Sequence, residues 1–300
     1  MVVLEDKYSN ENVILFGIGL VGQAILDELV LAEYQVIFRT SVKWQTGDIK
    51  EEEELLTIPL NRKKNISTAK IIWSAGRAGF SSSNEEIQSE FSVFQNVNWR
   101  IINHCKKHYD QVVYKLISSA GGLYEMNYIN RDIDNFSIMR PYGKLKRMQE
   151  RYLLSLVGII ILQIYRITTV YSNSLKNGRK GLISVLMKNL YLNQVSPIYA
   201  NPNTIRDYVL DSDVARYVVN HTSDSSTVKI LCTCDIFSIN QIVLHLERQF
   251  GKKAYANFNL LMSNSVNIIF HDSLKPHDFK HSSLLTNLRI FHNNILGYGA

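Results

Sequence analysis

Gly17-Ile18-Gly19-Leu20-Val21-Gly22 follows the apolar run Asn12-Val-Ile-Leu-Phe16 and opens an amphipathic segment that extends to Leu31. A GxGxxG spacing between a buried strand and a helix is typical of a dinucleotide-binding turn. Gly17 allows the tight turn, Gly19 lets the backbone approach a pyrophosphate, and Gly22 lets the helix pack closely. The helix N-terminus adds amide donors and a positive dipole end. We therefore predict that this turn, including Leu20 and Val21, binds a dinucleotide rather than serving as a purely structural glycine turn.

Strand and helix patterns alternate outward from this turn through the first half of the chain. Expected strands are residues 12–16, 34–38, 69–75, 111–117 and 158–171, and expected helices are residues 22–31, 85–107 and 144–156. Repeated βα units imply a parallel sheet with helices on both faces. We therefore predict the α/β class, with a doubly wound parallel sheet of the Rossmann type and a smaller mixed α/β C-terminal substrate domain.

The rhythm changes after Tyr171. Residues 172–180 are rich in Asn, Ser, Gly and charged side chains, a composition typical of a boundary loop. We predict a dinucleotide-binding domain over residues 1–172 and a mainly substrate-binding domain over residues 173–300. Within the second, residues 181–193 and 238–250 are expected helices, residues 195–200 are an expected strand, and residues 205–222 are expected to pack back on the first domain.

Composition is that of an enzyme of ordinary size. The chain has 300 residues, of which 46% are hydrophobic, and a formal net charge of +6. This length suffices to bury a sizeable core. The basic residues are dispersed, apart from the short runs Arg62-Lys-Lys64 and Lys106-Lys107. We therefore expect anionic small-molecule ligands and no nucleic-acid partner, because nucleic-acid-binding proteins gather their basic residues on one surface.

Cysteine and apolar patterns indicate a cytoplasmic protein. Cys105, Cys232 and Cys234 form an odd set without disulfide spacing, and no signal peptide opens the chain. The longest apolar run, residues 153–162, is too short to span a bilayer. We therefore expect a reducing compartment and no membrane span.

No metal site is predicted. Cys232 and Cys234 would share one face of a strand over residues 228–234, yet no further ligand lies close in sequence. The last thirty residues receive no other assignment. They contain three histidines whose spacings fit no compact ligand set: His271, His277 and His281. Buried thiols and structural or surface histidines are the simpler interpretation.

The end of the second expected strand bears on the cofactor. An acidic residue there commonly holds the adenosine ribose 2′-hydroxyl, whereas this chain has Arg39, followed by Thr40, Ser41 and Lys43. A guanidinium beside hydroxyls suits a 2′-phosphate, so NADP is favoured over NAD, the alternative being a solvated arginine.

Further cofactor contacts are expected at the next strand along. Ala75 and Gly76 end the strand over residues 69–75 at the edge of the sheet where open α/β proteins bind ligands. Arg77 follows them and either lies near the pyrophosphate or is a solvated loop residue.

Tyr142 and Lys146 stand four residues apart and therefore share one face of the expected helix. A free phenol, with a pKa of about 10, is a poor base at neutral pH. A nearby ammonium group stabilises the phenolate, and Lys146 can also bind cofactor ribose hydroxyls. Alone, the pair would be read as an exposed helix face.

A partner segment strengthens the catalytic interpretation. Ser118 and Ser119 end the strand over residues 111–117, at the edge where open sheets bind ligands, and Gly121-Gly122 follow. One serine would hydrogen-bond the reacting oxygen. The alternative is that both serines only cap a loop that the glycines turn. We predict Ser119, Tyr142 and Lys146 as catalytic residues, with Ser118 as the second choice.

Four ordered stretches support a family resemblance. They are Ser118-Ser-Ala-Gly-Gly-Leu-Tyr124, Pro141-Tyr-Gly-Lys-Leu-Lys146 with Glu150 and Tyr152, Tyr165-Arg-Ile-Thr-Thr-Val-Tyr171, and Ile205-Arg-Asp-Tyr-Val209 with Asp211, Asp213, Val214 and Ala215. From about Val13 to Lys253 the chain resembles the extended short-chain dehydrogenases/reductases of the NAD-dependent epimerase/dehydratase type, which act mostly on nucleotide-activated sugars. The resemblance implies that Arg206 contacts the substrate diphosphate, and that Asn98 (or Asn96) and Tyr171 lie at the substrate.

Several positions depart from the family pattern. The usual phosphate loop is GxxGxxG, and Phe16 stands at its first glycine. The frequent catalytic hydroxyl position falls on Ala120, so Ser119 is the first choice for that role. Three more positions carry residues uncommon in the family: Glu125 for a glycine, Thr169 for an asparagine and Ser172 for a glycine.

The resemblance implies hydride transfer at a sugar carbon, C4 in most relatives, with NADP or NAD. Tyr142 would exchange the proton, Ser119 would orient the oxygen and Lys146 would stabilise the phenolate. An epimerase and a keto-reductase both remain open, and Arg39 favours the reductase. A 4,6-dehydratase is less favoured, because no acidic pair follows Ser119.

An alternative of another class is a dinucleotide-binding regulatory protein that keeps the fold and has lost catalysis, which the altered glycine loop motivates. A homodimer is the expected assembly, because relatives pair through helices that include the tyrosine segment, and the apolar side of residues 142–156 permits this.

Overall fold

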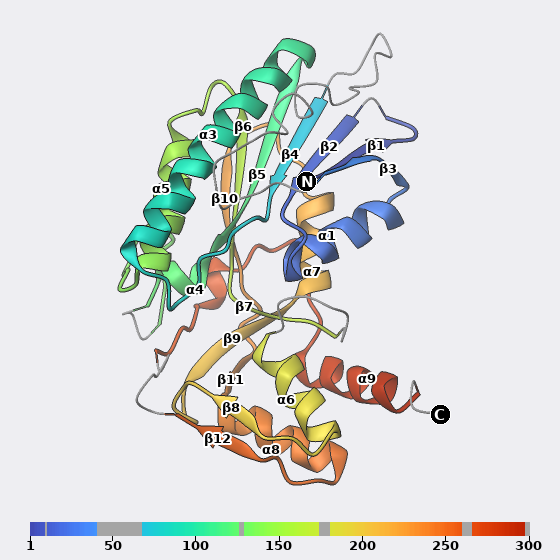
Figure 1. Ribbon diagram of the computed structural model, residues 1–300, viewed down its shortest axis with the longest axis vertical. Coiled ribbons are helices and arrows are strands. Elements are labelled where there is room, and N and C mark those ends of the chain that lie inside the picture. The colour runs from blue at the N-terminus through green and yellow to red at the C-terminus, as the bar shows by residue number, and fades with distance from the viewer. Residues whose placement is uncertain (10, 41–67, 126–128, 174–180, 260–265, 298–300) are drawn as a thin grey trace.

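A seven-stranded sheet with the order β10-β6-β5-β4-β2-β1-β3 dominates the computed structural model, which describes residues 1–9, 11–40, 68–125, 129–173, 181–259 and 266–297 (Figure 1). The strands are β1 (Val2–Asp6), β2 (Glu11–Phe16), β3 (Tyr34–Arg39), β4 (Thr68–Trp73), β5 (Gln111–Ser119), β6 (Ile161–Ile167) and β10 (Thr227–Leu231). The pairs β10·β6, β6·β5, β5·β4 and β4·β2 are parallel. The predicted doubly wound α/β class is confirmed.

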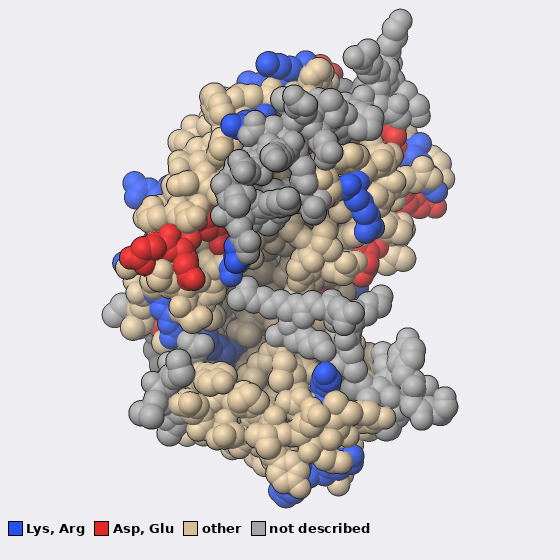
Figure 2. Space-filling model, viewed as in Figure 1, with Lys and Arg blue, Asp and Glu red and all other residues tan. Residues whose placement is uncertain are grey.

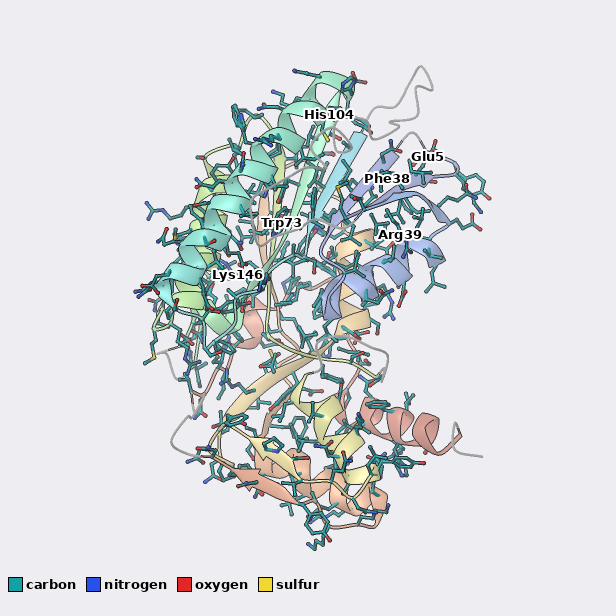
Figure 3. All side chains as sticks on the ribbon, in the orientation of Figure 1. Glu5, Phe38, Arg39, Trp73, His104 and Lys146 are labelled. Carbon is teal, nitrogen blue, oxygen red and sulfur yellow. The ribbon has the colours of Figure 1, made fainter. Side chains whose placement is uncertain are left out.

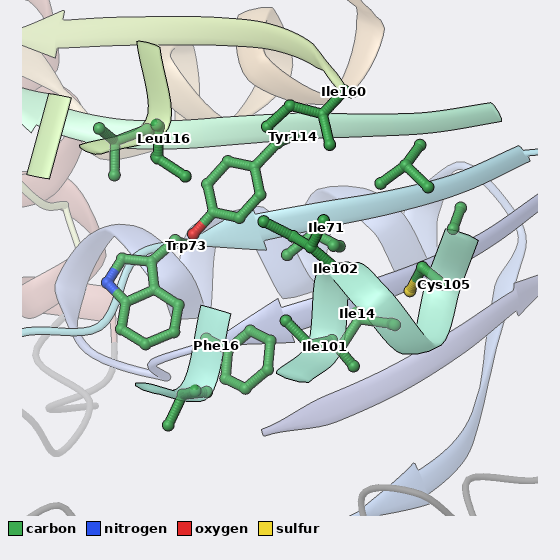
Figure 4. Close-up of a cluster of buried hydrophobic side chains, with 14 of the residues drawn as sticks. Ile14, Phe16, Ile71, Trp73, Ile101, Ile102, Cys105, Tyr114, Leu116 and Ile160 are labelled. Carbon is green, nitrogen blue, oxygen red and sulfur yellow. The ribbon is translucent and has the colours of Figure 1, made fainter. Parts of the chain in front are cut away.

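Helices cover both faces of this sheet. On one face lie α1 (Leu20–Leu31) and α7 (Asp211–Asn220), and on the other lie α3 (Asn84–His108) and α5 (Pro141–Leu154). Figure 4 shows the core beneath α3, where the Trp73 ring lies 5.0 Å from the rings of both Phe16 and Phe94. Trp73 is the last residue of β4, so this packing fixes the end of the strand that leads into the expected cofactor loop.

Strand β1 is a feature that the sequence patterns did not reveal. It lies between β2 and β3 and runs antiparallel to both, with Val2 opposite Leu15 on one side and Arg39 on the other. Val2, Val3 and Leu4 are buried, with Val3 in one apolar cluster of the core and Val2 and Leu4 in another. In the usual order of this fold the strand after the first helix lies directly beside the first strand. Here β3 is displaced outward by one strand spacing, about 4.8 Å.

A smaller part of the molecule lies below the carboxyl ends of the large sheet (Figure 1). It holds the sheet β11-β9-β7, the strand pair β12-β8 and three helices around a second apolar core. Its elements are β7 (Thr169–Tyr171), α6 (Leu182–Tyr191), β8 (Ser196–Ile198), β9 (Ile205–Leu210), β11 (Ile236–Ser238), α8 (Ile239–Phe250), β12 (Ala256–Phe258) and α9 (Leu284–Gly297). Because α7 and β10 return to the large sheet, the chain crosses between the two parts more than once. The division at residue 172 stays a prediction.

Two expected strands end differently in the structure. The segment 158–171 forms β6 and β7 in separate sheets, with a break at Thr168, whose hydroxyl donates to Asp207 Oδ1 at 2.7 Å. Strand β10 stops at Leu231 rather than at residue 234, because the Asp207 carboxylate accepts the backbone N–H groups of the next turn, at Thr233 and Cys234. Cys234 has a φ of +64°, so the expectation that it shares a strand face with Cys232 is wrong.

Neither a membrane-spanning helix nor a metal-binding cluster occurs among the described residues. Within those ranges, no helix is both long and apolar enough to cross a bilayer. The same residues contain no group of three or more His, Cys, Asp and Glu side chains that could hold a metal ion.

Candidate active site

The glycine turn joins β2 to α1 at the carboxyl edge of the large sheet. Gly17 has a φ of +85°, and a Cβ on it would lie 2.4 Å from Ala75 Cα. A Cβ on Gly22 would lie 1.8 Å from the carbonyl oxygen of Gly17, so both positions require glycine for the turn itself. A Cβ on Gly19 would meet nothing within 4 Å. Gly19, the middle glycine of the motif, therefore leaves its backbone open to a ligand, as a pyrophosphate site requires.

A cavity of about 620 Å³ opens beside this turn. Its lining includes Gly17, Gly19, Ala75, Gly76, Arg77 and Glu90, from the turn, the end of β4 and the start of α3. The Glu90 carboxylate accepts the N–H groups of Arg77 at 3.0 Å and Ala78 at 2.7 Å, which fixes the loop after β4. Leu20 and Val21 are half-buried in the first turn of α1, whose N–H groups point toward its N-terminus. The turn and the cavity fit a dinucleotide.

Acidic side chains border this cavity on the side of α3. In Figure 2 they gather at the left margin, over the region where α3 begins in Figure 1. Glu85 and Glu86 lie in the first turn of that helix, and Glu86 is held by the capping box with Ser83.

Arg39 lies apart from the glycine turn. It is exposed at the end of β3, and β1 separates it from β2, so the structure does not bring its backbone next to the turn. Figure 3 shows Lys146 and Arg39 on opposite sides of the lower end of the sheet. Ser41 and Lys43, which were expected to accompany Arg39, fall outside the described residues.

Tyr142, Lys146 and Ser119 converge around Gly122. The tyrosine ring lies against Gly122, because a Cβ there would be 3.0 Å from Tyr142 Cδ1. Ser119 Oγ accepts the N–H of the same Gly122 at 3.2 Å. Lys146 Nζ donates to the Ile117 carbonyl at 3.3 Å and lies 5.8 Å from the centre of the tyrosine ring. The short helix α4 (Ala120–Leu123) and the first two turns of α5 thus bring the three predicted groups together.

Ser118 occupies a different environment from Ser119. It is 1% exposed, and its hydroxyl donates to Glu150 Oε1 at 2.6 Å. Glu150 is itself fully buried and pairs with Arg166 through two hydrogen bonds of 3.0 Å and 2.8 Å. Ser118 therefore belongs to a buried polar network that joins β5, α5 and β6, whereas the Ser119 hydroxyl contacts Gly122, against which the tyrosine ring packs.

The three predicted substrate residues do not lie together. Arg206, on β9, is mostly buried, and burial lowers the pKa of its guanidinium to about 10. Asn98 is fully buried, with its amide donating to the Phe94 carbonyl at 2.8 Å and accepting from the Tyr114 hydroxyl at 2.6 Å. Tyr171 is 1% exposed in the core of the smaller part, where its hydroxyl accepts from Asn287. The substrate contacts of Asn98 and Tyr171 stay predictions, and the function proposed below does not depend on them.

Three residues in this region had no role in the predictions. Phe80 packs edge-on against Tyr142, with ring centres 5.4 Å apart, and the Arg140 guanidinium lies 5.0 Å above the Phe80 ring. Phe80 lies in the loop after a parallel strand, and this position could have indicated a residue of the site. Glu90, which holds the loop after β4, carries no such signal. Glu125 stood out in the sequence only as a residue uncommon at its position.

Comparisons with known proteins agree with this geometry. The model of the NAD dependent epimerase/dehydratase family matches residues 13–228. A protein of Methanocaldococcus jannaschii, assigned provisionally as a UDP-glucose 4-epimerase, is 25% identical over 281 residues, which are 86% of this chain and 88% of that protein.

Solved structures share the fold across almost the whole chain. UDP-glucose 4-epimerase of Thermotoga maritima, solved with UDP-glucose, is 17% identical with a TM-score of 0.73, covering 96% of this chain and 99% of that one. UDP-glucose 4-epimerase of Thermus thermophilus, solved with NAD, is 17% identical with a TM-score of 0.71, covering 93% and 96%.

Proposed function

This chain belongs to the NAD-dependent epimerase/dehydratase family, and we propose that it inverts a hydroxyl-bearing carbon, C4, of a nucleotide-activated sugar. The observation that carries the proposal is the convergence of Ser119, Tyr142 and Lys146 around Gly122, at the carboxyl edge of the sheet that also carries the open glycine turn. The proteins it resembles include UDP-glucose 4-epimerases. The alternative of a regulatory protein without catalysis is not favoured, because the family consists of enzymes.

NAD is the cofactor we propose, in place of the NADP that Arg39 suggested. The 2′-phosphate contact expected of Arg39 has no support from its position on the displaced edge strand β3. The related Thermus thermophilus enzyme was solved with NAD. When bound, NAD accepts a hydride from the sugar carbon and can return it to either face of the same carbon. This choice favours an epimerase over a reductase, because no external reductant is then required.

Each catalytic residue has a task that follows from its position. Tyr142 takes the proton of the sugar hydroxyl as the hydride leaves C4, and gives it back when the hydride returns. Lys146, close to the tyrosine ring, stabilises the phenolate by its positive charge. Ser119 Oγ accepts from Gly122 N and keeps its own proton for donation to the reacting oxygen.

Arg206 is proposed to hold the diphosphate of the substrate from the side of the smaller part. A guanidinium matches phosphate oxygens through paired hydrogen bonds. The lowered pKa of Arg206 still lies well above neutrality, so the residue is a cation at pH 7. The sugar would then lie between Arg206 and the group of Ser119, Tyr142 and Lys146.

The test is turnover of a panel of nucleotide sugars in the presence of NAD, with inversion followed by NMR. We expect Tyr142→Phe to lower kcat by about 10³-fold, within the range of general acid–base catalysis. Tyr255→Phe is the matched control, because Tyr255 is 60% exposed in the smaller part. Unchanged turnover in Tyr142→Phe would refute the proposed mechanism, and tight NAD binding without turnover on any sugar would support a regulatory protein instead.

A further inference from the structure

We propose that Glu125 is a positioning residue for Tyr142, an inference that rests on the proposed function of the tyrosine. Its carboxylate fixes the chain that enters α5 and thereby sets where the tyrosine lies relative to Ser119. Glu125 is 1% exposed and follows directly after the segment that carries Ser119 and Gly122. It therefore connects two segments that must keep a constant separation during catalysis.

The hydrogen bonds of Glu125 reach the segment before α5. Its Oε2 accepts the N–H groups of Met139 and Arg140, each at 3.0 Å. Its backbone N–H donates to the Ser137 carbonyl at 2.9 Å, and its Oε1 lies 3.0 Å from Arg140 Nη1. Hydrogen bonds in a buried site are stronger than in water, so these contacts anchor residues 137–140.

Helix α5 has no capping group of its own, which explains why it needs this carboxylate. In a capping box, a Glu or Gln at the third helical position accepts the N–H of the N-cap residue. The N-cap of α5 is Arg140, whose side chain has no acceptor, and the third helical position is Gly143. A Cβ on Gly143 would lie 2.0 Å from the Gly122 carbonyl, so no larger residue fits there. Glu125 supplies the missing acceptor from outside the helix.

Tyr142 stands two residues beyond the anchored Arg140. Its ring is held between Gly122, on the segment of Glu125, and Phe80, over which the Arg140 guanidinium lies. Loss of the Glu125 hydrogen bonds would free the entry to α5 and shift the phenol relative to Ser119. A displacement of about 1 Å in a reacting group can cost about 10²-fold in rate.

Three substitutions separate hydrogen bonding from charge. Glu125→Gln keeps an oxygen that can accept both N–H groups, Glu125→Asp keeps the charge but shortens the reach, and Glu125→Ala removes both. We expect kcat to fall by about 10²-fold in Glu125→Ala, with KM changing much less, and to be largely retained in Glu125→Gln. Glu125→Asp should fall between them. If Glu125→Ala does not fold, the proposal is tested by whether kcat is higher in Glu125→Gln than in Glu125→Asp.

The matched control is Ser238→Ala, which removes a capping box at the start of α8 in the smaller part and leaves the segment before α5 unchanged. It should lower the unfolding temperature and leave kcat unchanged, which separates positioning from loss of a helix cap in general. A second readout does not depend on turnover. Hydrogen exchange of the Met139 and Arg140 amides should be fast in Glu125→Ala and remain slow in Glu125→Gln and Ser238→Ala.

Two results would overturn the proposal. One is a Glu125→Ala enzyme with wild-type kcat and slow exchange at both amides. The other is an activity ranking in which Glu125→Asp equals or exceeds Glu125→Gln, since charge would then matter more than the hydrogen bonds. If the wild-type enzyme turns over no nucleotide sugar, the proposed function fails, whereas the exchange comparison still decides whether Glu125 anchors the helix.

Discussion

Adjacent serines at the end of β5 show how strongly position decides the role of a residue. Ser119 caps α4 beside the tyrosine, while Ser118 is enclosed with Glu150 and Arg166. Successive side chains of a strand point to opposite faces, so the two hydroxyls cannot both reach the same ligand. The structure therefore separates two candidates that the sequence could only rank.

Ser119→Ala should lower kcat by about 10²-fold, because it removes a donor to the reacting oxygen, and should lower stability by about 1 kcal/mol, because it removes the N-cap of α4. Ser118→Ala is the matched variant and should lower stability by about 1–3 kcal/mol, because it removes a hydrogen bond to a buried carboxylate, while kcat is largely kept. Steady-state kinetics and thermal unfolding of both variants provide the measurement. The opposite pattern, with Ser118 controlling kcat, would reverse the assignment.

Lys115 predicts a pH dependence of stability. It is 1% exposed, its ammonium donates to the Val218 and His221 carbonyls, and burial lowers its pKa to about 7. Between pH 7 and the unfolded pKa of about 10.4, the unfolded chain binds more protons, so the contribution of Lys115 to stability rises with pH. The slope is at most about 1.4 kcal/mol per pH unit.

Lys115→Met should therefore lose this rise, so that wild type gains on the variant as pH increases from 7 to 10. Denaturant unfolding at several pH values measures the difference. The exposed Lys188→Met is the control and should follow wild type. Parallel curves for Lys115→Met and wild type would contradict the lowered pKa.

Residue spacing in the sequence was sufficient to find the groups that the structure brings together. GxGxxG and the Tyr142–Lys146 spacing depend on local periodicity, which a sequence displays directly. Asn98 and Tyr171 were selected by resemblance alone, and sequence spacing cannot tell that the Asn98 amide is enclosed against Tyr114. The contacts of Glu125 and Phe80 depend on segments that meet only in the folded chain.

At the scale of elements, the glycines in the turn from β2 to α1 differ in role: Gly22 is required for packing, whereas Gly19 leaves room for a ligand. Gly19→Ala should keep the stability of the free protein within about 0.5 kcal/mol, because its Cβ meets no protein atom. Its NAD dissociation constant should rise by at least about tenfold, or 1.4 kcal/mol, because the methyl group lies where the pyrophosphate approaches. Gly22→Ala should lose stability and binding together. Calorimetry that finds unchanged NAD affinity in Gly19→Ala would place the cofactor elsewhere.

Strand β1 has the largest effect on the cofactor assignment. Its residues were not recognised as a strand, and nothing local in the sequence indicates that it enters the sheet between β2 and β3. The usual strand order therefore placed Arg39 beside the glycine turn, and the NADP preference depended on that placement. Pairing across the sheet is a long-range property, whereas the elements on either side follow from local patterns.

Arg39→Ala tests the choice of NAD over NADP. We expect the affinities for NAD and for NADP both to stay within about twofold of wild type, because an exposed side chain on the displaced edge strand makes no contact with the ribose. Fluorescence titration with each cofactor provides the measurement. A selective loss of NADP binding in Arg39→Ala would restore the original assignment.

At the scale of the whole molecule, the chain returns to the large sheet after entering the smaller part. Thr168 and Asp207 join β6, β9 and β10 through hydrogen bonds, so the two parts share a continuous polar connection. This connection holds β9, the strand that carries Arg206, on the side of the carboxyl edge of the large sheet (Figure 1). The domain boundary at residue 172, the homodimer and the cytoplasmic location stay predictions.

The central claim is that one site removes a hydride from a sugar carbon and returns it to the same carbon. The most direct measurement is turnover of a nucleotide sugar that carries deuterium at C4, followed by NMR and mass spectrometry of the product. The account predicts a C4-inverted product that keeps its deuterium and takes up no solvent hydrogen at that carbon. Loss of the deuterium to water during inversion would contradict it.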